Sequence, residues 1–349
     1  MKAYVLHGIG DLRYEDVETP ILEKETVLVK VRAAGICGSD IPRIYQTGAY
    51  SHPLIPGHEF SGEVIETGSG VDNAWLNRRV GIFPMIPCME CTQCRKMQYE
   101  MCRQYSYLGS RTDGGFAEYV RVPVWNLLKL PDAVSFEQAA MLEPTAVAVH
   151  AARRIQVNPG ENAVVCGLGT IGLLLVMILQ SMDISDIYVI GNKDMQRRMA
   201  IGLGIPAERF CDTRIQPAED WVKEKTDGEG VDVFFDCAGK SSVLEEAVKC
   251  VCAAGRIMLV GNPASDMHLE KALYWKILRR QLTLKGTWNS SYTHEGEDDW
   301  HFALNAIQCG RLHPERLITH RFALPELFHG MECMRDKTEE YVKMMGICR

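Results

Sequence analysis

The chain has 349 residues, of which 46% are hydrophobic and 24% are charged, and its net charge is −7 at neutral pH. This length allows two domains with a sizeable core, and the composition is that of an ordinary soluble globular protein. The acidic balance argues against nucleic acid as a partner, because nucleic acid needs a basic surface. The N-terminus has no apolar signal core, and the longest apolar stretch, Ile171 to Leu179, is far too short to span a membrane. We therefore expect a cytoplasmic location and no membrane contact.

Residues 1 to about 140 are rich in short alternating runs bounded by Gly and Pro turns, such as TVLVKVRAAGICGSD, FSGEVIETGSG and GGFAEYVRVP. Runs of this kind predict an all-β, barrel-like segment. Near Val134 the pattern becomes helical over SFEQAAMLEPTAVAVHAARRI, in which Pro144 is expected to open a second helix.

From Glu161 onward, expected strands (ENAVVCGLG, DIYVIGN, VDVFFDCAG, GRIMLVG) alternate with expected helices (TIGLLLVMILQSM, KDMQRRMAIGLG, SSVLEEAVKCV). This alternation predicts a doubly wound parallel sheet. After about Trp275 the strand LTLKGTWN and the helices EDDWHFALNAIQCG and LFHGMECMRD contain no dinucleotide motif, so we assign them to the first domain. The expected division is a catalytic domain of residues 1–143 and 277–349 and a dinucleotide-binding domain of residues 144–276.

Four cysteines lie close together in the pattern C-x2-C-x2-C-x7-C, namely Cys88, Cys91, Cys94 and Cys102. Four thiolates at this spacing predict a closed tetrahedral zinc site in a lobe of residues 88–102, which supports a loop and does no chemistry. An iron–sulfur cluster is the alternative. The total of 13 cysteines is odd and no secretion signal is present, which argues against a disulfide framework.

A second metal site is expected from Cys37 in GICGSD, His58 in PGHEFSG and Glu143 in LEPTAV. A thiolate, an imidazole and a carboxylate leave one tetrahedral position for water or substrate, which is the arrangement of a catalytic zinc. Glu59 is the alternative third ligand, or it stands behind Glu143.

Two polar residues beside Cys37 are candidates for roles near this metal. Asp40 is expected to orient the metal-bound imidazole, because such a ring usually donates its other N–H to a carboxylate, a carbonyl or water. Ser39 is a candidate proton relay. The plainer interpretations are an aspartate that caps a turn and an ordinary turn serine.

Gly167, Gly169 and Gly172 follow the strand AVVC, and Thr170 and Ile171 begin the helix after it. In this strand-turn-helix context, the G-x-G-x-x-G pattern predicts a tight turn that lets a pyrophosphate approach the helix N-terminus.

The next strand ends at Gly191 and Asn192, where a protein that binds NAD would be expected to carry an acid for the ribose diol. Lys193 follows, and with the two arginines of the next helix it is placed to pair with a 2′-phosphate. This favours NADP over NAD. The alternative is that these cations form a solvated helix face and that Asp194 supplies a shifted acid.

The motifs GICGSD, PGHEFSG, the four-cysteine lobe, DGGFAEY, LEPTAV and GLGTIG occur in the order seen in zinc-containing medium-chain alcohol and polyol dehydrogenases. The chain resembles this family over essentially its whole length. The resemblance implies a GroES-like β-barrel catalytic domain, a Rossmann domain, a homodimer or homotetramer, and two zinc ions per chain, one catalytic and one structural. The C-terminal YVKMMGICR lacks the usual apolar closing strand, so we expect the last strand to be frayed.

The expected reaction is hydride transfer between a nicotinamide cofactor and a secondary alcohol of a polyol or polyol phosphate. In this scheme zinc lowers the pKa of the substrate hydroxyl, while Ser39 and the cofactor ribose relay its proton. Arg43 is the first candidate to bind a substrate phosphate, and His52 and Arg111 are weaker ones.

Three alternatives remain for the activity. The substrate is a free polyol or another secondary alcohol, such as sorbitol or butanediol, or the chain is a non-catalytic protein that binds zinc and nucleotide. A zinc-free reductase of the same fold is disfavoured by Cys37, His58 and the four-cysteine lobe.

Overall fold

The structure of the chain, a computed structural model, describes residues 1–295 and 297–348. Contacts between residues divide the chain into two units. Unit 1 comprises Met1–Ala146 and Ser290–Arg349, and unit 2 comprises Val147–Asn289. The first division falls close to the expected one, whereas the second falls later in the chain than the expected boundary at residue 277.

Unit 1 is built around the long strand β3 (Thr26–Ile36). In the described residues its main sheet has the order β16-β17-β3-β4-β5-β9, and β8 also pairs with β3. Two short pairs, β1-β2 and β6-β7, complete the β structure, and a core of buried apolar side chains contributed by both ends of the chain fills the unit. This is the β-rich first domain that the alternating runs predicted. The other strands are β1 (Lys2–Gly8), β2 (Asp11–Asp16), β4 (Glu59–Thr67), β5 (Arg79–Ile82), β6 (Met85–Ile86), β7 (Ser106–Tyr107), β8 (Tyr119–Pro123), β9 (Leu127–Lys129), β16 (Ile318–Ala323) and β17 (Lys343–Ile347).

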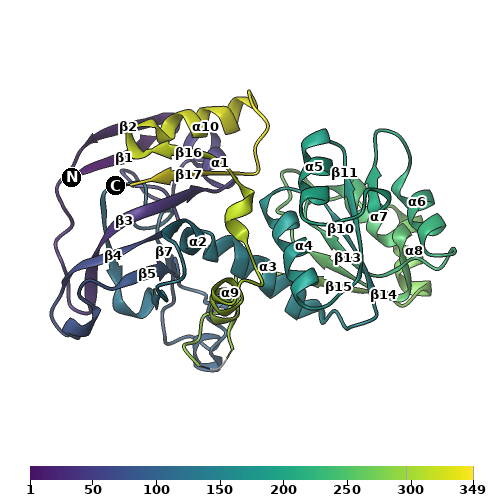
Figure 1. Ribbon diagram of the computed structural model, residues 1–349, viewed down its shortest axis with the longest axis horizontal. Coiled ribbons are helices and arrows are strands. Elements are labelled where there is room, and N and C mark those ends of the chain that lie inside the picture. Colours follow the sequence, from purple (N-terminus) through teal and green to yellow (C-terminus); the bar gives the residue numbers. More distant parts are fainter. Residues whose placement is uncertain (296, 349) are drawn as a thin grey trace. The chain divides into compact units, whose positions relative to one another are not determined.

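The last strand is not frayed, and that expectation was wrong. β17 pairs with β16 on one side and with β3 on the other, and Figure 1 shows the yellow strand β17 beside the purple strand β3. Met344 and Met345 are fully buried. Hydrogen bonding on both sides and burial keep the strand in place without the usual apolar ending, although residue 349 lies outside the described residues.

The helices α2, α3, α9 and α10 lie where the sequence predicted helices, whereas the short α1 was not anticipated, and α3 continues past the end of the first segment of unit 1 at Ala146. Ser135 caps α2 in a reciprocal pair of hydrogen bonds with Gln138, an arrangement that satisfies two backbone N–H groups at the helix start. A second helix, α3, follows almost at once and begins with Leu142-Glu143-Pro144. The bounds are α1 (Asp40–Pro42), α2 (Phe136–Ala140), α3 (Leu142–Ile155), α9 (Asp299–Gln308) and α10 (Leu327–Asp336).

Unit 2 is the doubly wound parallel sheet that the alternation predicted. Its strands have the order β12-β11-β10-β13-β14-β15, all parallel, and helices cover both faces (Figure 1). The strands β11 and β12 are added on one side of β10, and β13 to β15 are added on its other side. Folds of this kind bind ligands at the strand where the side of addition changes. The strands are β10 (Asn162–Cys166), β11 (Asp186–Gly191), β12 (Phe210–Asp212), β13 (Val231–Asp236), β14 (Val251–Leu259) and β15 (Thr283–Gly286), and the helices are α4 (Thr170–Ser181), α5 (Asp194–Gly202), α6 (Ala218–Lys225), α7 (Ser241–Cys250) and α8 (Lys271–Arg279).

The assignment of LTLKGTWN to the first domain was wrong. β15 comes from this stretch and pairs in parallel with β14, from Arg256↔Thr283 to Leu259↔Gly286. The helix α8 connects β14 to β15, and β15 forms the edge of the sheet beside β14. The elements β12, α6 and α8 were also not anticipated from the sequence.

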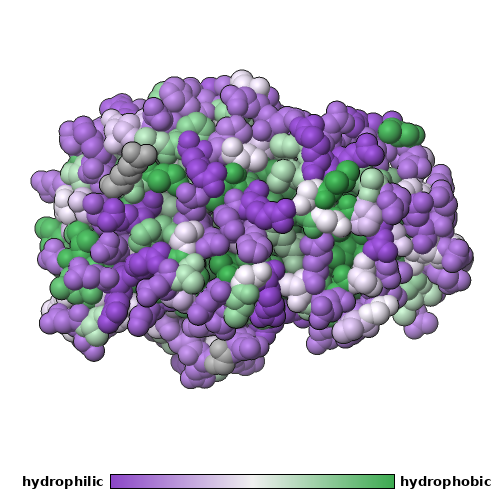
Figure 2. Space-filling model, in the orientation of Figure 1, coloured by the Kyte–Doolittle hydropathy of each residue, from purple (hydrophilic) through white to green (hydrophobic). Residues whose placement is uncertain are grey.

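None of the helices in the described residues is long and apolar enough to cross a membrane. The face shown in Figure 2 carries mostly hydrophilic side chains, with hydrophobic ones in small groups between them.

Candidate metal and nucleotide sites

The turn after β3 presents Cys37 and Ser39 together. The amide of Asp40 donates to the carbonyl of Cys37 (3.0 Å), which closes the turn and starts α1. Ser39 Oγ donates to Cys37 Sγ (3.3 Å). The hydroxyl predicted to be a proton relay therefore lies directly beside the predicted metal ligand.

His58 and Glu59 reach Cys37 through the antiparallel pairing of β3 with β4, in which Gly35 lies opposite Glu59. A Cβ atom at Gly35 would lie 2.4 Å from Glu59 Oε2, so a side chain there would displace the carboxylate. Ligand atoms of Cys37, His58 and Glu59 all lie within 4.8 Å of one another. A thiol, an imidazole and a carboxylate at this separation form a donor set that zinc accepts.

Asp40 is fully buried beside this group. Its carboxylate accepts from the Cys37 amide (3.0 Å) and from Arg43 Nη1 (2.6 Å). His58 Nδ1 forms an ion pair with Asp40 Oδ1 (3.4 Å) when the ring is protonated, and it has no hydrogen-bond partner among the described residues.

The charges of this group are coupled. Burial opposes the charge on the imidazole, but Asp40 and Cys37 outweigh it and hold the pKa of His58 well above its ordinary value. Burial also opposes the charge on Asp40, but His58 and Arg43 hold its pKa below the ordinary value. The position of Asp40 is the one that a carboxylate needs in order to orient a metal-bound imidazole. The donors therefore fit a zinc ion.

Lys343 belongs to this site, and sequence reasoning missed it. Its Nζ lies 2.5 Å from Glu59 Oε2 and donates to the Ile36 carbonyl (3.1 Å). The side chains of Lys343 and Glu59 are only 3% and 1% exposed. Burial lowers the pKa of Lys343, but Glu59 and Cys37 outweigh it, so the pKa lies above its ordinary value. The one available signal was a single lysine inside the otherwise apolar run YVKMMGI.

Glu143 lies in the first turn of α3 and is also buried. Tyr107 donates its hydroxyl to Glu143 Oε1 (3.1 Å). Burial raises the pKa of Glu143 to about 7, with Glu59 adding to this and His58 acting against it. Among the described residues, Glu59 and not Glu143 joins Cys37 and His58 in the compact group. The role of Glu143 as third zinc ligand stays a prediction.

The four cysteines of the lobe come together as their spacing predicted. Ligand atoms of Cys88, Cys91, Cys94 and Cys102 all lie within 4.8 Å of one another, and none of the four forms a disulfide. Backbone N–H groups, first that of Arg103, lower the pKa of Cys91 to about 6, while burial raises that of Cys94 to about 12. A group of four thiols around one point fits a closed metal site.

The predicted dinucleotide turn has the required geometry in unit 2. Gly167 directly follows β10 and has a φ of +92°, which favours glycine. Gly169 caps α4, whose first residues are Thr170 and Ile171. A Cβ atom on Gly172 would lie 2.1 Å from the Gly167 carbonyl oxygen, so only glycine allows this close packing of turn and helix.

A cavity of about 310 Å³ adjoins this turn and is lined by Gly167, Gly191, Asn192 and Lys193. The Asn192 amide donates to Gln196 Oε1 (3.0 Å). These four residues, all predicted to contact the cofactor, therefore line the same cavity.

Two features of this cavity were not anticipated from the sequence. Lys240, at the start of α7, and Glu246, within α7, also line it. Asp194, the alternative acid for the ribose, instead pairs with Arg214 (2.5 Å). The cavity thus holds two lysines and one glutamate, and the Asp194 carboxylate is already bound.

Comparisons with known proteins give matches over most of the chain. A family model described as the alcohol dehydrogenase GroES-like domain matches residues 23–132, and one described as a zinc-binding dehydrogenase matches residues 170–307. The chain is 33% identical over 322 residues to galactitol 1-phosphate 5-dehydrogenase of Escherichia coli K12, which covers 92% of each chain. It is also 33% identical over 360 residues to (R,R)-butanediol dehydrogenase of Bacillus subtilis 168, which covers 99% of each.

Solved structures show the same fold. The crystal structure of galactitol-1-phosphate dehydrogenase from Escherichia coli superposes with a TM-score of 0.92 at 32% identity, covering 99% of this chain and 100% of that one. A zinc-binding dehydrogenase from Sinorhizobium meliloti 1021 bound to NADP has a TM-score of 0.89 at 27% identity, covering 99% and 98%. An alcohol dehydrogenase from Escherichia coli CFT073 complexed with NADH has a TM-score of 0.91 at 27% identity, covering 99% of each.

Proposed function

We infer a hydride-transfer activity for this chain because it belongs to the zinc-containing medium-chain alcohol dehydrogenases, with a GroES-like domain in unit 1 and a Rossmann-type domain in unit 2. We propose that its substrate is a secondary alcohol of a polyol or polyol phosphate. The observation that carries this is the group of Cys37, His58 and Glu59 with Asp40 behind it, in a chain that also has the dinucleotide turn.

Cys37, His58 and a carboxylate would hold a zinc ion, which would supply a Lewis acid for the substrate hydroxyl, and the turn at Gly167 would hold the nicotinamide cofactor that takes up hydride. The residues of the chain prepare for this step. Asp40 lies 3.4 Å from Nδ1 of His58, where it would orient the imidazole, and the Cys37 amide and Arg43 in turn hold Asp40. Ser39, beside Cys37 Sγ, is the group we propose to carry the hydroxyl proton away.

Glu59 and Glu143 divide the remaining acidic roles. We propose that one of the two carboxylates would bind zinc and that the other keeps its present hydrogen-bond donor, Lys343 for Glu59 or Tyr107 for Glu143. Glu59 is paired with Lys343 and Glu143 with Tyr107, so each has a fixed resting position.

For the cofactor we propose NADP in preference to NAD. Gly191 leaves no carboxylate at the end of β11 to repel a 2′-phosphate, and Lys193 lines the same cavity.

For the substrate we propose a polyol phosphate, of which galactitol 1-phosphate is the example suggested by a relative. A free secondary alcohol is the second candidate, since the butanediol dehydrogenase is as similar in sequence. The test is a screen of galactitol 1-phosphate, galactitol, sorbitol and 2,3-butanediol with NAD and with NADP.

We expect the zinc-loaded protein to oxidise at least one of these alcohols, fastest with the phosphate ester and NADP. Cys37→Ser should abolish turnover, whereas Cys309→Ser, at an exposed cysteine outside both metal groups, should not change it. Binding of NADP without turnover of any alcohol would favour the non-catalytic alternative and overturn the proposal.

We also propose that the protein is a homodimer or homotetramer. β15 is an edge strand of its sheet, and several large apolar side chains are exposed on α8 and beside β15. These are Tyr274, Trp275, Leu278 and Trp288. Exposed apolar groups of this size mark interfaces. Light scattering coupled to size-exclusion chromatography measures the state directly, and a monomer would refute it. A cytoplasmic location stays a prediction.

A further inference from the structure

Arg111 is held between two aromatic rings in unit 1. Its guanidinium carbon lies 4.0 Å from the ring centre of Tyr50 and 4.4 Å from that of Tyr105. Cation–π contacts of this kind hold a guanidinium in place and leave its N–H groups open for hydrogen bonds. The rings therefore orient a cation without neutralising it.

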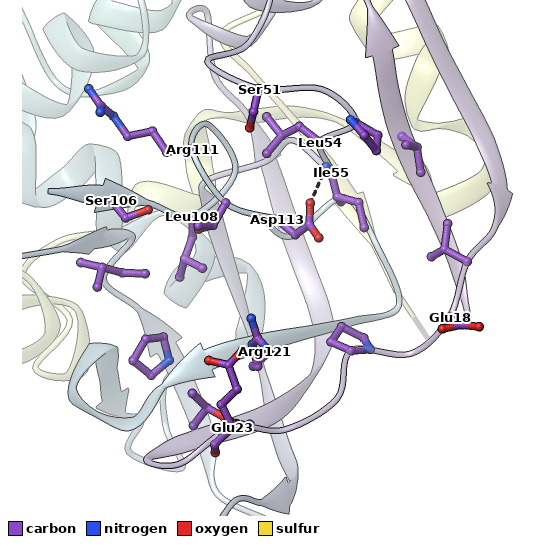
Figure 3. Close-up of a pocket in the computed structure, with 18 of the residues that line it drawn as sticks. Glu18, Glu23, Ser51, Leu54, Ile55, Ser106, Leu108, Arg111, Asp113 and Arg121 are labelled. Atoms are coloured by element: carbon purple, nitrogen blue, oxygen red, sulfur yellow. Dashed lines mark hydrogen bonds and ion pairs between the residues drawn. The ribbon is translucent and has the colours of Figure 1, made fainter.

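Arg111 has no carboxylate partner in the part of the chain that the structure describes, and its Nε is buried without an acceptor. It lines a cavity of about 670 Å³ together with Asp113, but Figure 3 shows its side chain extending away from the labelled carboxylates of Asp113 and Glu18. Arg121, which lines the same cavity, donates instead to Glu23 (2.6 Å). Arg111 is thus a fixed charge without a counter-charge.

The loop that carries Arg111 is fastened to the turn that carries His58. The amide of Gly115 donates to the Gly57 carbonyl (2.8 Å), and that of Gly114 donates to the Ile55 carbonyl (2.8 Å). A Cβ atom on Gly109 would lie 2.3 Å from Gly57 O, so the two segments pack backbone to backbone. The position of Arg111 relative to His58 is therefore set by the fold of unit 1.

Two tyrosine rings separate Arg111 from the metal group. Tyr107 lies edge to face with His58 (5.8 Å between ring centres) and donates to Glu143 (3.1 Å). Tyr105 lies against Tyr107 (6.2 Å) and under Arg111. The ring contacts from His58 through Tyr107 and Tyr105 to Arg111 therefore connect the metal group with this cation within unit 1.

We propose that Arg111 binds the phosphate of a polyol phosphate substrate and so determines the preference for the phosphate ester. This rests on the proposed polyol-phosphate activity and deepens it. A planar guanidinium matches the oxygens of a phosphate in two parallel hydrogen bonds. Arg43, the first candidate from the sequence, instead donates from Nη1 to Asp40 Oδ1 (2.6 Å) and so holds Asp40 beside His58.

The test uses the zinc-loaded full chain with galactitol 1-phosphate and galactitol as probes. Arg111→Met should lower kcat/KM for the phosphate ester about ten- to a hundredfold, mainly through KM, and that for galactitol much less. Arg111→Lys should fall between wild type and Arg111→Met, because it keeps the charge and loses the planar fork. Arg121→Met is the matched control and should change neither value.

Calorimetric titration of galactitol 1-phosphate into wild type and Arg111→Met separates this inference from the activity itself. If no polyol is turned over, loss of galactitol 1-phosphate binding in Arg111→Met still supports the role of Arg111. Failure of the wild type to bind galactitol 1-phosphate, or equal binding by both proteins, overturns it. Titration with galactonate completes the test, since dependence of its binding alone on Arg111 would show a carboxylate site instead.

Discussion

Replacing Lys343 with Met should destabilise unit 1 strongly. The substitution keeps the length of the side chain and removes the cation that lies 2.5 Å from Glu59 Oε2, as well as the donor to the Ile36 carbonyl. Both side chains of the ion pair are almost fully buried, so the carboxylate is left without a partner and without water. Removing one partner of such a pair typically costs about 3–5 kcal/mol.

The free energy of unfolding is measured by urea titration of zinc-free protein, with hydrogen exchange of peptides from β3 and β17 to show that unit 1 opens. A second variant, Glu59→Gln, and the double variant complete a double-mutant cycle. We expect the double variant to recover much of the loss, with a coupling energy of about 2–3 kcal/mol. Lys2→Met, which breaks an exposed pair with Asp16, should leave stability unchanged.

The same titration of the zinc-loaded protein shows which carboxylate holds the metal. Zinc bound to Glu59 supplies the cation that Lys343 no longer provides, so the loss should then be smaller than in zinc-free protein. Effects of Lys343→Met and Glu59→Gln that simply add, or a loss below about 1 kcal/mol, would refute the view that the two residues act as a buried unit.

Three further predictions concern metal, cofactor and support of the site. Elemental analysis should find two zinc ions per chain, one for each ligand group. The variant Cys37→Ser should lose one zinc with its melting temperature little changed, whereas Cys91→Ser should lose the other zinc and melt at a lower temperature. Full activity with one zinc ion per chain would contradict both assignments. Gly191→Asp should move the ratio of kcat/KM from NADP toward NAD by about tenfold or more, because a carboxylate repels the 2′-phosphate; a wild-type preference for NAD would show that Lys193 does not bind that phosphate. Arg43→Met should lower kcat/KM for galactitol and galactitol 1-phosphate alike, since Arg43 holds Asp40, and a loss confined to the phosphate ester would return Arg43 to phosphate recognition.

Features carried by short spacing were predictable from the sequence. The four cysteines meet because loop residues so close in the chain can converge on one point. Gly167 and Gly172 are required by a positive φ and by a close backbone approach, and such needs leave a local pattern of glycines. The alternation of strands and helices in unit 2 was predictable for the same reason, except for β12, α6, α8 and β15.

Features that depend on distant pairing were not predictable. Lys343 is 284 residues away from Glu59 in the chain, and its function depends on the register of β17 beside β3. Arg111 looked weaker than Arg43 in the sequence because distance from Cys37 along the chain favoured Arg43. Only the fold shows that Arg43 has an acidic partner and that two rings hold Arg111. The strand β15 was assigned to the wrong domain because the sequence of a short edge strand does not indicate which sheet it joins.

The place of β17 between β3 and β16 also has a consequence for synthesis on the ribosome. The nascent chain carries β3, β4 and the acid of Glu59 while all of unit 2 is still being translated, and residues up to 343 must emerge before Lys343 can neutralise that acid. During this interval one edge of β3 lacks its later neighbour β17, and an unpaired edge invites pairing with other chains. Unit 2, which is continuous in the chain, can fold first. We therefore expect any product that terminates before β17 to be captured by chaperones or to aggregate, while its nucleotide-binding half is already folded.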